Sequence, residues 1–463
     1  MAGARQFTKR SEIPEPRDEV FAWHERRGAL SRLLPPWEPV AVEREPDDIA
    51  VGSRAVFRTT LPGPVRLRWV AELAGYDPPN EFRDIQLSGP FAEWEHRHRF
   101  EAAGDAATLL TDEVSYRLPP RGGFAGSAVA SRLERMFAYR HRQLAADLAA
   151  HRRARERGMR PLHVAVTGAS GLIGGALTAF LTSGGHRVTR LVRRSPAGTG
   201  EVSWDPSAGF IDAERLRDVD AVVHLAGAPI AGARWSPDHK RRVRDSRVQG
   251  TRLLAETLAG LTAGPGALIC GSAIGFYGSD RGDELLTEDS ARGTGFLAGV
   301  AGEWEAAADP ARQAGIRVVH VRTGIVQSPR GGALRVQLPL FRLGLGGRLG
   351  SGGQWVSWIG IDDIVGIFHH ALANPDLAGV INGTAPHPVT NAEHTAILAG
   401  VLGRPAVLPV PGAGPAVLLG REGARETAFA SQRVLPGRAE ETGYRFRHRD
   451  LESALRHVLG RTA

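Results

Sequence analysis

A glycine-rich loop between a β-branched run and an apolar helix pattern is the feature that most constrains the fold of this chain. Residues 162–167 read LHVAVT and lead directly into GASGLIG, residues 168–174. A loop of this kind joins the first strand of an α/β sheet to its first helix and presents backbone N–H groups to phosphate. The spacing predicts a doubly wound parallel sheet that begins near residue 160.

Each position of the loop has a physical role in this interpretation. Gly168 permits the tight turn, Gly171 lets the backbone approach a pyrophosphate, and Gly174 allows the helix to pack against the strand. Ser170 adds a hydroxyl donor, and the first amides of the helix face the anion. We therefore expect the pyrophosphate of a dinucleotide to contact Gly168, Ser170, Gly171, Leu172, Ile173 and Gly174.

The second predicted strand, residues 187–192, ends at Arg193 and Arg194. NAD-specific domains usually place an acidic residue here, against the ribose 2′-hydroxyl. An arginine can instead pair with a 2′-phosphate and stack on adenine. The sequence favours NADP over NAD, and a solvated strand end is the alternative interpretation of the two arginines.

From about residue 161 the pattern changes to short Val, Ile and Leu runs separated by helical stretches, as expected for a parallel sheet covered on both faces. The strands are predicted at residues 162–167, 187–192, 220–225, 267–271 and 316–321.

The N-terminal part has a different periodicity. Residues 65–73 and 112–118 alternate with period two, which is typical of antiparallel strands with one wet face. Apolar residues then recur at helical spacing from Val129 to Leu148, which predicts one long amphipathic helix. We therefore expect two domains, residues 1–157 and 158–463, the second with a C-terminal cap over about residues 400–463.

The composition is that of a folded protein, with 42% hydrophobic and 23% charged residues among 463. No apolar run reaches the roughly 18 residues that cross a bilayer, and the N-terminal residues lack the apolar segment of a secretory signal. The single cysteine, Cys270, lies in an apolar run, which fits a reducing compartment. We expect a cytoplasmic protein without a membrane span.

The net charge of +8 comes mostly from arginines scattered along the chain. The densest cluster, residues 151–157, is interpreted as a solvated helix end that leads into a linker. We expect a small-molecule substrate or a hydrophobic ligand as partner, no nucleic acid and no metal site.

Two segments near the N-terminus, residues 20–24 (VFAWH) and 28–37 (GALSRLLPPW), resemble the start of the polyketide-cyclase-like helix-grip proteins of the START-like superfamily. The resemblance covers roughly residues 5–150. It implies that a hydrophobic small molecule binds under the sheet. The alternative is that Trp23, Trp37 and Trp69 belong only to the core.

The glycine spacing, the segment VVHLAG at 222–227 and the segment GSAIGFYG at 271–278 resemble the extended short-chain dehydrogenase/reductases. More narrowly, they are similar to the atypical NAD-dependent epimerase/dehydratase family proteins, and matching segments continue through WIGIDD at 358–363 to Gly443 and Tyr444. The resemblance implies cofactor contacts from Leu225, Ala226, Gly227, Arg247, Ser272 and Val326.

One departure from the active short-chain enzymes concerns their Tyr-x-x-x-Lys pair, in which the lysine lowers the tyrosine pKa for proton transfer. The corresponding positions hold Leu297 and Ala301, neither of which transfers a proton. Ser272 matches the residue that orients a substrate oxygen. Tyr277 is a candidate substitute acid, with shaping of a turn as the alternative.

Further candidates each have a plainer alternative. Asp362 and Asp363 precede an apolar helix pattern, so capping is favoured over catalysis. Glu303 and Glu305 flank a tryptophan on a predicted helix and reach either the substrate side or solvent. Residues 331–353, rich in Gly and Arg, are expected to form a loop that closes over an anionic substrate or merely crosses between elements.

The favoured hypothesis is an NADP-dependent oxidoreductase or epimerase-like enzyme, with hydride transfer at the nicotinamide and an apolar substrate supplied by the helix-grip domain. The alternative is a non-catalytic sensor that couples dinucleotide binding to hydrophobic-ligand binding. The missing Tyr and Lys pair is what keeps the second hypothesis open.

Overall fold

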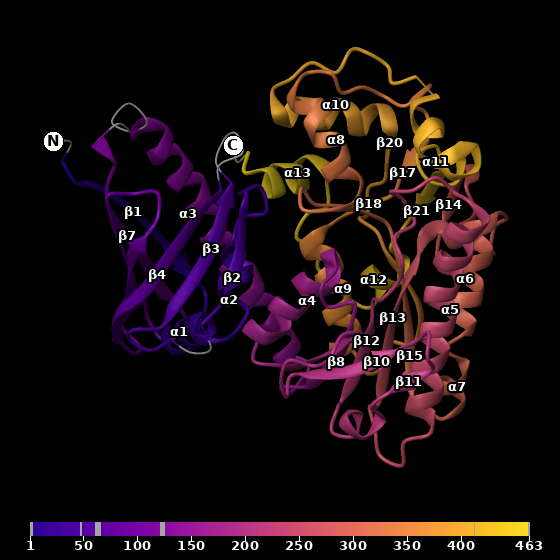
Figure 1. Cartoon of the computed structure of the whole chain (residues 1–463), viewed down its shortest axis with the longest axis horizontal. Coiled ribbons are helices and arrows are strands. Elements are labelled where there is room, and N and C mark those ends of the chain that lie inside the picture. The colour runs from indigo at the N-terminus through magenta and orange to yellow at the C-terminus, as the bar shows by residue number, and fades with distance from the viewer. Residues whose placement is uncertain (1–2, 47–48, 61–65, 121–125, 412, 462–463) are drawn as a thin grey trace. The chain divides into compact units, whose positions relative to one another are not determined.

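A computed structural model describes residues 3–46, 49–60, 66–120, 126–411 and 413–461. Backbone contacts divide the chain into two compact units (Figure 1). One comprises Met1–Glu156, Ala179–Gly185 and His457–Ala463, and the other comprises Arg157–Thr178 and His186–Arg456.

The N-terminal unit is built on one antiparallel sheet with the strand order β1-β7-β6-β5-β4-β3-β2. Its strands are β1 (Arg5–Ile13), β2 (Val40–Arg44), β3 (Arg54–Thr60), β4 (Arg66–Asp77), β5 (Glu81–Ser88), β6 (Glu93–Ala102) and β7 (Thr108–Arg117). Its helices are α1 (Arg17–Glu25), α2 (Ala29–Leu33) and α3 (Gly126–Glu156). The predicted antiparallel sheet followed by one long helix is confirmed.

The sheet forms where side chains of alternating polarity give it one buried face. In β6 the buried positions are Trp94, His96, His98 and Phe100, every second residue, as a pleated strand requires. The strand predicted over 65–73 is β4; Val65 lies outside the described residues. Strands β2 to β7 form a meander in chain order, and β1 adds a strand beside β7 that the sequence did not predict.

The second unit contains a sheet with the order β11-β10-β9-β8-β12-β13-β15-β19, in which all described pairs are parallel except β10 with β11. Its strands are β8 (His163–Thr167), β9 (Arg187–Val192), β10 (Glu201–Asp205), β11 (Phe210–Ile211), β12 (Ala221–His224), β13 (Ala267–Ala273), β15 (Arg317–Thr323) and β19 (Gly379–Gly383). The five predicted strands are present, and the sequence missed β10, β11 and β19.

Helices cover both faces of this sheet, as predicted for a doubly wound fold. Figure 1 shows α5, α6 and α7 along one side of the strands and α9 along the other. The helices are α4 (Leu172–Ser183), α5 (Pro237–Ala259), α6 (Phe296–Ala306), α7 (Asp309–Gln313) and α9 (Ile361–Ala373). The central strands are buried on both faces; β12, for example, has no exposed residue.

The remaining segments form a smaller lobe from parts of the chain that are distant in sequence. Three two-stranded sheets pair β14 (Asp280–Leu286) with β21 (Ser431–Val434), β16 (Ile325–Gln327) with β18 (Trp358–Gly360), and β17 (Trp355–Val356) with β20 (Val389–Thr390). Its helices are α8 (Gly332–Arg342), α10 (Asn391–Leu402), α11 (Ala413–Glu426) and α12 (Gly437–Glu441). The last helix, α13 (Leu451–Leu459), has residues in both units. Residues after 400 therefore interleave with earlier segments.

The structure corrects the loop predicted over residues 331–353, because α8 occupies half of that range. Leu334, Leu338 and Phe341 of α8 are buried at helical spacing, and this apolar face stabilises the helix despite Pro339 within it. Only the part after Arg342 is largely irregular. Across the described ranges, no helix is both long enough and apolar enough to span a bilayer.

Candidate functional site

The glycine loop between β8 and α4 has the backbone geometry that its sequence predicts. Gly168 adopts φ +67°, a left-handed conformation that favours glycine, and its carbonyl accepts a hydrogen bond of 2.9 Å from the Gly171 amide. A Cβ atom on Gly174 would lie only 2.2 Å from the Gly168 carbonyl oxygen. The close approach of helix to loop therefore depends on Gly174, and the first N–H groups of α4 open at this point.

The segment after β12 is held against the loop by one threonine. The Thr167 hydroxyl oxygen accepts hydrogen bonds from the amides of Leu225, at 3.0 Å, and Ala226, at 3.2 Å, and it contacts His224 Nδ1 at 2.7 Å. A Cβ atom on Gly168 would lie 2.7 Å from the Leu225 carbonyl carbon. Adjacent parallel strands thus bring the predicted residues 225–227 beside the glycine loop.

Arg247 of α5 is a buried cation next to this segment. Its Nη1 donates to the carbonyls of Ala228, at 2.9 Å, and Val243, at 3.0 Å, and its guanidinium lies 5.1 Å from the centre of the Trp304 ring. Burial lowers the pKa of Arg247 to about 10, and no carboxylate of the described chain forms an ion pair with it. A buried guanidinium in this state is stabilised by an anionic ligand.

The two arginines at the end of β9 differ in what they contact. Arg194 donates to both carboxylate oxygens of Glu201, at 2.6 and 2.8 Å, and to the Ser195 carbonyl. Arg193 is exposed. Of the two, Arg193 has the freer side chain for a ligand, a distinction that the sequence alone did not make.

Ser272 and Tyr277 belong to one buried polar network. The Ser272 hydroxyl donates to Glu305 at 2.7 Å, and Arg322 binds the same carboxylate through Nε and Nη2 at 2.8 and 2.9 Å. Arg322 Nη1 donates to the Tyr277 oxygen at 3.0 Å, and the Tyr277 hydroxyl donates to Asn382 at 2.8 Å. These five hydrogen bonds connect residues of β13, α6, β15 and β19.

The contacts of this network and its burial account for the pKa shifts of Glu305 and Tyr277. Burial raises the pKa of Glu305, but the hydrogen bonds and charge of Arg322 outweigh burial and leave it below its ordinary value. Burial raises the pKa of Tyr277 by more than Arg322 lowers it. Tyr277 is fully buried and both sides of its hydroxyl are engaged, so proton transfer from it would require both contacts to break.

Other predicted residues lie nearby but in different environments. Val326 lies on β16, which follows the end of β15. Leu297 and Ala301 are on α6, and the Leu297 Cβ lies 3.3 Å from where a Cβ of Gly275 would be. Glu303 is exposed and forms an ion pair with Arg244 at 2.6 Å, which is the solvated alternative for this residue.

Asp363 corrects the capping prediction. It lies inside α9, whose N-cap Gly360 has no side-chain cap. Its Oδ1 accepts from the Tyr444 hydroxyl at 3.0 Å and the Arg447 amide at 2.7 Å, and its Oδ2 accepts from the His448 amide at 3.1 Å. Burial raises the pKa of Asp363 to about 6. Its carboxylate therefore fixes the segment before α13 rather than its own helix.

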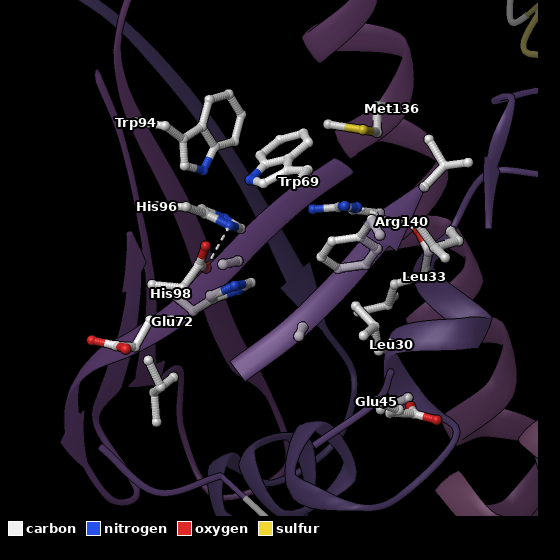
Figure 2. A pocket seen from close by; sticks show the side chains of 18 of the residues that line it. Leu30, Leu33, Glu45, Trp69, Glu72, Trp94, His96, His98, Met136 and Arg140 are labelled. Carbon is white, nitrogen blue, oxygen red and sulfur yellow. Dashed lines mark hydrogen bonds and ion pairs between the residues drawn. The ribbon is translucent and has the colours of Figure 1, made fainter. Parts of the chain in front are cut away.

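The N-terminal unit encloses a cavity of about 530 Å³ between its sheet and α3. Figure 2 shows apolar side chains around it, among them Leu30, Leu33, Trp69, Trp94 and Met136. Of the three tryptophans considered from the sequence, Trp69 lines the cavity, whereas Trp23 is fully buried core and Trp37 packs on Tyr139. The volume is within the range of small-molecule pockets.

Asp84, His96 and His98 line part of this cavity, and Asp112 and His141 are linked to them by direct contacts. Asp112 of β7 contacts His96 Nε2 at 2.9 Å, His98 Nδ1 at 2.7 Å and His141 Nε2 at 2.5 Å. Asp84 contacts His96 Nδ1 at 3.3 Å. We name these five residues the His–Asp cluster. Asp84, His96 and His98 also place three possible metal-ligand atoms within 4.8 Å of one another, although Asp112 already holds both histidines.

Sequence reasoning missed the His–Asp cluster and the partner of Ser272. The segment EWEHRHRFEA carried a signal, because its period-two pattern puts His96 and His98 on the same face as Trp94 and Phe100. Glu305 and Arg322 lie on a helix and a strand that only the folded sheet brings together, and no spacing in the sequence indicates that pair.

Comparison with known proteins gives the relationships of both units. Residues 164–382 match the NAD dependent epimerase/dehydratase family, residues 13–140 match "Polyketide cyclase / dehydrase and lipid transport", and residues 410–458 match a domain of unknown function, DUF1731. The chain is 45% identical over 298 residues to the epimerase family protein Mb2239 of Mycobacterium bovis, which covers 64% of this chain and 98% of that protein. The chain belongs to the NAD dependent epimerase/dehydratase family.

Two solved structures extend this membership. A nucleoside-diphosphate sugar epimerase from Corynebacterium glutamicum is 39% identical, with a TM-score of 0.83 over 98% of this chain and 90% of that chain. The human epimerase family protein SDR39U1, solved with NADPH, is 35% identical, with a TM-score of 0.58 over 64% of this chain and 99% of that chain. The first epimerase structure matches both units of this chain, and the second covers about the length of the epimerase family part.

Proposed function

We propose that this epimerase family protein binds NADP(H) at the glycine loop and acts as an oxidoreductase or epimerase-like enzyme on a small molecule. The observation that carries the proposal is the pairing of a loop shaped for phosphate with a buried cation, Arg247, that has no carboxylate partner among the described residues. The human relative solved with NADPH supports the same cofactor, and NAD is the alternative.

The residues present fit such a cofactor. The amides of residues 170–174 would bind the pyrophosphate, since the loop has no side chain larger than Ser170 before α4 begins. Residues 225–227 would border the adenosine, and Arg247 a phosphate or ribose. Arg193 would pair with a 2′-phosphate. Val326 would lie toward the nicotinamide, which when bound supplies hydride transfer at one face.

The chain's own polar groups then act on the substrate. We propose that Ser272 orients the hydroxyl form of the substrate: its O–H donates a hydrogen bond to Glu305, so the Ser272 oxygen can accept a hydrogen bond from the substrate alcohol. Arg322 fixes Glu305 in place by two hydrogen bonds. Tyr277 is better placed to position Arg322 than to transfer a proton, because its hydroxyl is already held by Arg322 and Asn382.

A non-catalytic sensor is the second candidate function. It is favoured by Leu297 and Ala301, which stand where the active short-chain enzymes have Tyr and Lys, and by the cavity in the N-terminal unit. In either case we propose that residues 1–157 bind a hydrophobic ligand and that residues 158–463 bind the nucleotide. The buried, unpaired Cys270 supports a cytoplasmic location.

NADPH titration of the full chain, followed by oxidation of NADPH against a panel of carbonyl compounds, tests both candidates. The enzyme hypothesis predicts tight NADPH binding and turnover with at least one carbonyl, and a loss of turnover in Ser272→Ala with NADPH affinity retained. Tight binding without turnover on any carbonyl supports the sensor. Absence of binding by both NADPH and NADH would overturn the proposed cofactor.

A further inference from the structure

Figure 2 shows the side chain of Arg140, on α3, among the residues that line the cavity. Its Nε donates to the Leu33 carbonyl at 3.3 Å, and its guanidinium lies 4.9 Å from the centre of the Phe137 ring. In the described part of the chain no carboxylate forms an ion pair with Arg140. Its two Nη groups therefore lack a strong acceptor, and burial lowers the pKa of Arg140.

The carboxylates whose charges act on Arg140 are Asp112, Asp84 and Glu38, and each of them contacts other side chains. Asp112 is held by three histidines, and Asp84 is held by His96. Glu38 binds Arg132. These charges help to keep Arg140 protonated, but none of them makes a direct contact with its guanidinium. Arg26 and Arg132 also line the cavity, but they form ion pairs with Glu19 and Glu38. Arg140 thus places a cation with unused donors beside the apolar side chains of the lining.

A guanidinium in an apolar pocket selects ligands by geometry. Its planar fork matches the two oxygens of a carboxylate, and a charge-assisted pair away from bulk water is stronger than a neutral hydrogen bond. An alcohol offers one acceptor and no charge, and an ammonium is repelled. The apolar walls would hold the rest of the molecule.

We propose that the cavity binds an amphipathic carboxylic acid, with its apolar chain or ring system against Leu30, Leu33, Trp69 and Met136 and its carboxylate on Arg140. This inference rests on the proposed hydrophobic-ligand function of residues 1–157 and specifies the chemical class of that ligand. The proposed NADP(H) site does not enter into it.

The test compares three probes of equal chain length, dodecanoate, dodecanol and dodecylammonium, by calorimetric titration of the full chain below their micelle concentrations. Wild type is expected to bind dodecanoate about tenfold more tightly than dodecanol, and dodecylammonium most weakly. Arg140→Gln should lose the preference for dodecanoate while it still binds dodecanol. Arg135→Gln is the matched control, because Arg135 is exposed on the same helix and does not line the cavity.

The outcomes test the carboxylate inference and the hydrophobic-ligand function separately. Equal affinity of wild type for dodecanoate and dodecanol, or an undiminished preference in Arg140→Gln, overturns the carboxylate inference while hydrophobic binding stands. Binding of none of the probes overturns the inference and the hydrophobic-ligand function together, and NADPH titration of the same sample reports separately on the nucleotide site. If Arg140→Gln unfolds, Arg140→Lys should keep a preference smaller than that of wild type, since it retains the charge without the fork.

Discussion

The nucleotide loop and the N-terminal cavity hold ligands with different parts of the chain. The loop at residues 168–174 uses backbone amides, and its side chains are small because the backbone must come close to its ligand. The cavity uses large side chains from several strands and α3, such as Trp69, His96 and Arg140. Ligand binding by a backbone site is disrupted by almost any added side-chain atom. Ligand binding by a side-chain site depends instead on the charge and protonation state of those side chains.

The largest effect should come from adding one methyl group to the backbone site. Gly174→Ala places a Cβ where only 2.2 Å separates it from the Gly168 carbonyl oxygen, so loop and helix must move apart. We expect NADPH affinity to fall by about a hundredfold in a fluorescence titration. The matched control is Gly175→Ala, whose added Cβ would meet its nearest atom at 3.5 Å, an ordinary contact. Equal affinities of the two variants would contradict the backbone description of the site.

A smaller effect is expected at the cavity, where the His–Asp cluster should make the free energy of unfolding depend on pH. Burial lowers the pKa of His96, but hydrogen bonds and charge from Asp112 and Asp84 outweigh burial and raise it to about 9, above the ordinary 6.5. A raised pKa stabilises the folded state fully below pH 6.5, and this stability is lost as the pH rises through 9. Urea unfolding followed by tryptophan fluorescence should show a loss of about 2–3 kcal/mol between pH 6.5 and 9.5.

His96→Gln should flatten that pH dependence, because the glutamine does not titrate. His163→Gln, on β8 in the other unit, leaves the His–Asp cluster intact and should keep the wild-type loss. If His96→Gln retained the full loss, another group would be responsible for it and the charge assignment of the cluster would be wrong.

The smallest effect concerns the side-chain contribution to the nucleotide site. Arg193→Gln should weaken NADPH binding by about tenfold and leave NADH binding nearly unchanged, since only NADPH carries the 2′-phosphate. Arg194→Gln removes the same charge from a side chain already held by Glu201, so its effect on the NADPH to NADH ratio should be smaller. A larger loss of NADPH affinity in Arg194→Gln than in Arg193→Gln would mean that Arg194, and not Arg193, contacts the 2′-phosphate.

The same contrast explains how much of the molecule the sequence predicts. Strands such as β8 and β12 were predictable because parallel strands are buried on both faces and appear as short runs of mostly apolar residues. The glycine loop was predictable because backbone binding requires glycine at fixed spacing. By contrast, β1 has only Phe7 and Ile13 as large apolar residues, so no alternation marks it.

The cavity and the polar network were beyond sequence reasoning for a different reason. Arg140 lies on a helix rich in charged residues, and only the fold shows that it faces an enclosed volume rather than solvent. Glu305 and Arg322 are paired through tertiary structure alone. The loop predicted over 331–353 failed because its glycines and Pro339 hid the apolar face of α8.

The pairing of β1 with β7 has a consequence for synthesis. Residues 5–13 leave the ribosome long before their partners, which lie between Thr108 and Tyr116, so β1 cannot join the sheet until β7 has been made. Until then this segment has no partner strand to bond with. Its four charges, Arg5, Lys9, Arg10 and Glu12, oppose pairing between neighbouring nascent chains. The small number of apolar residues in β1 makes this strand hard to predict from the sequence. It also reduces the tendency of the nascent chain to aggregate.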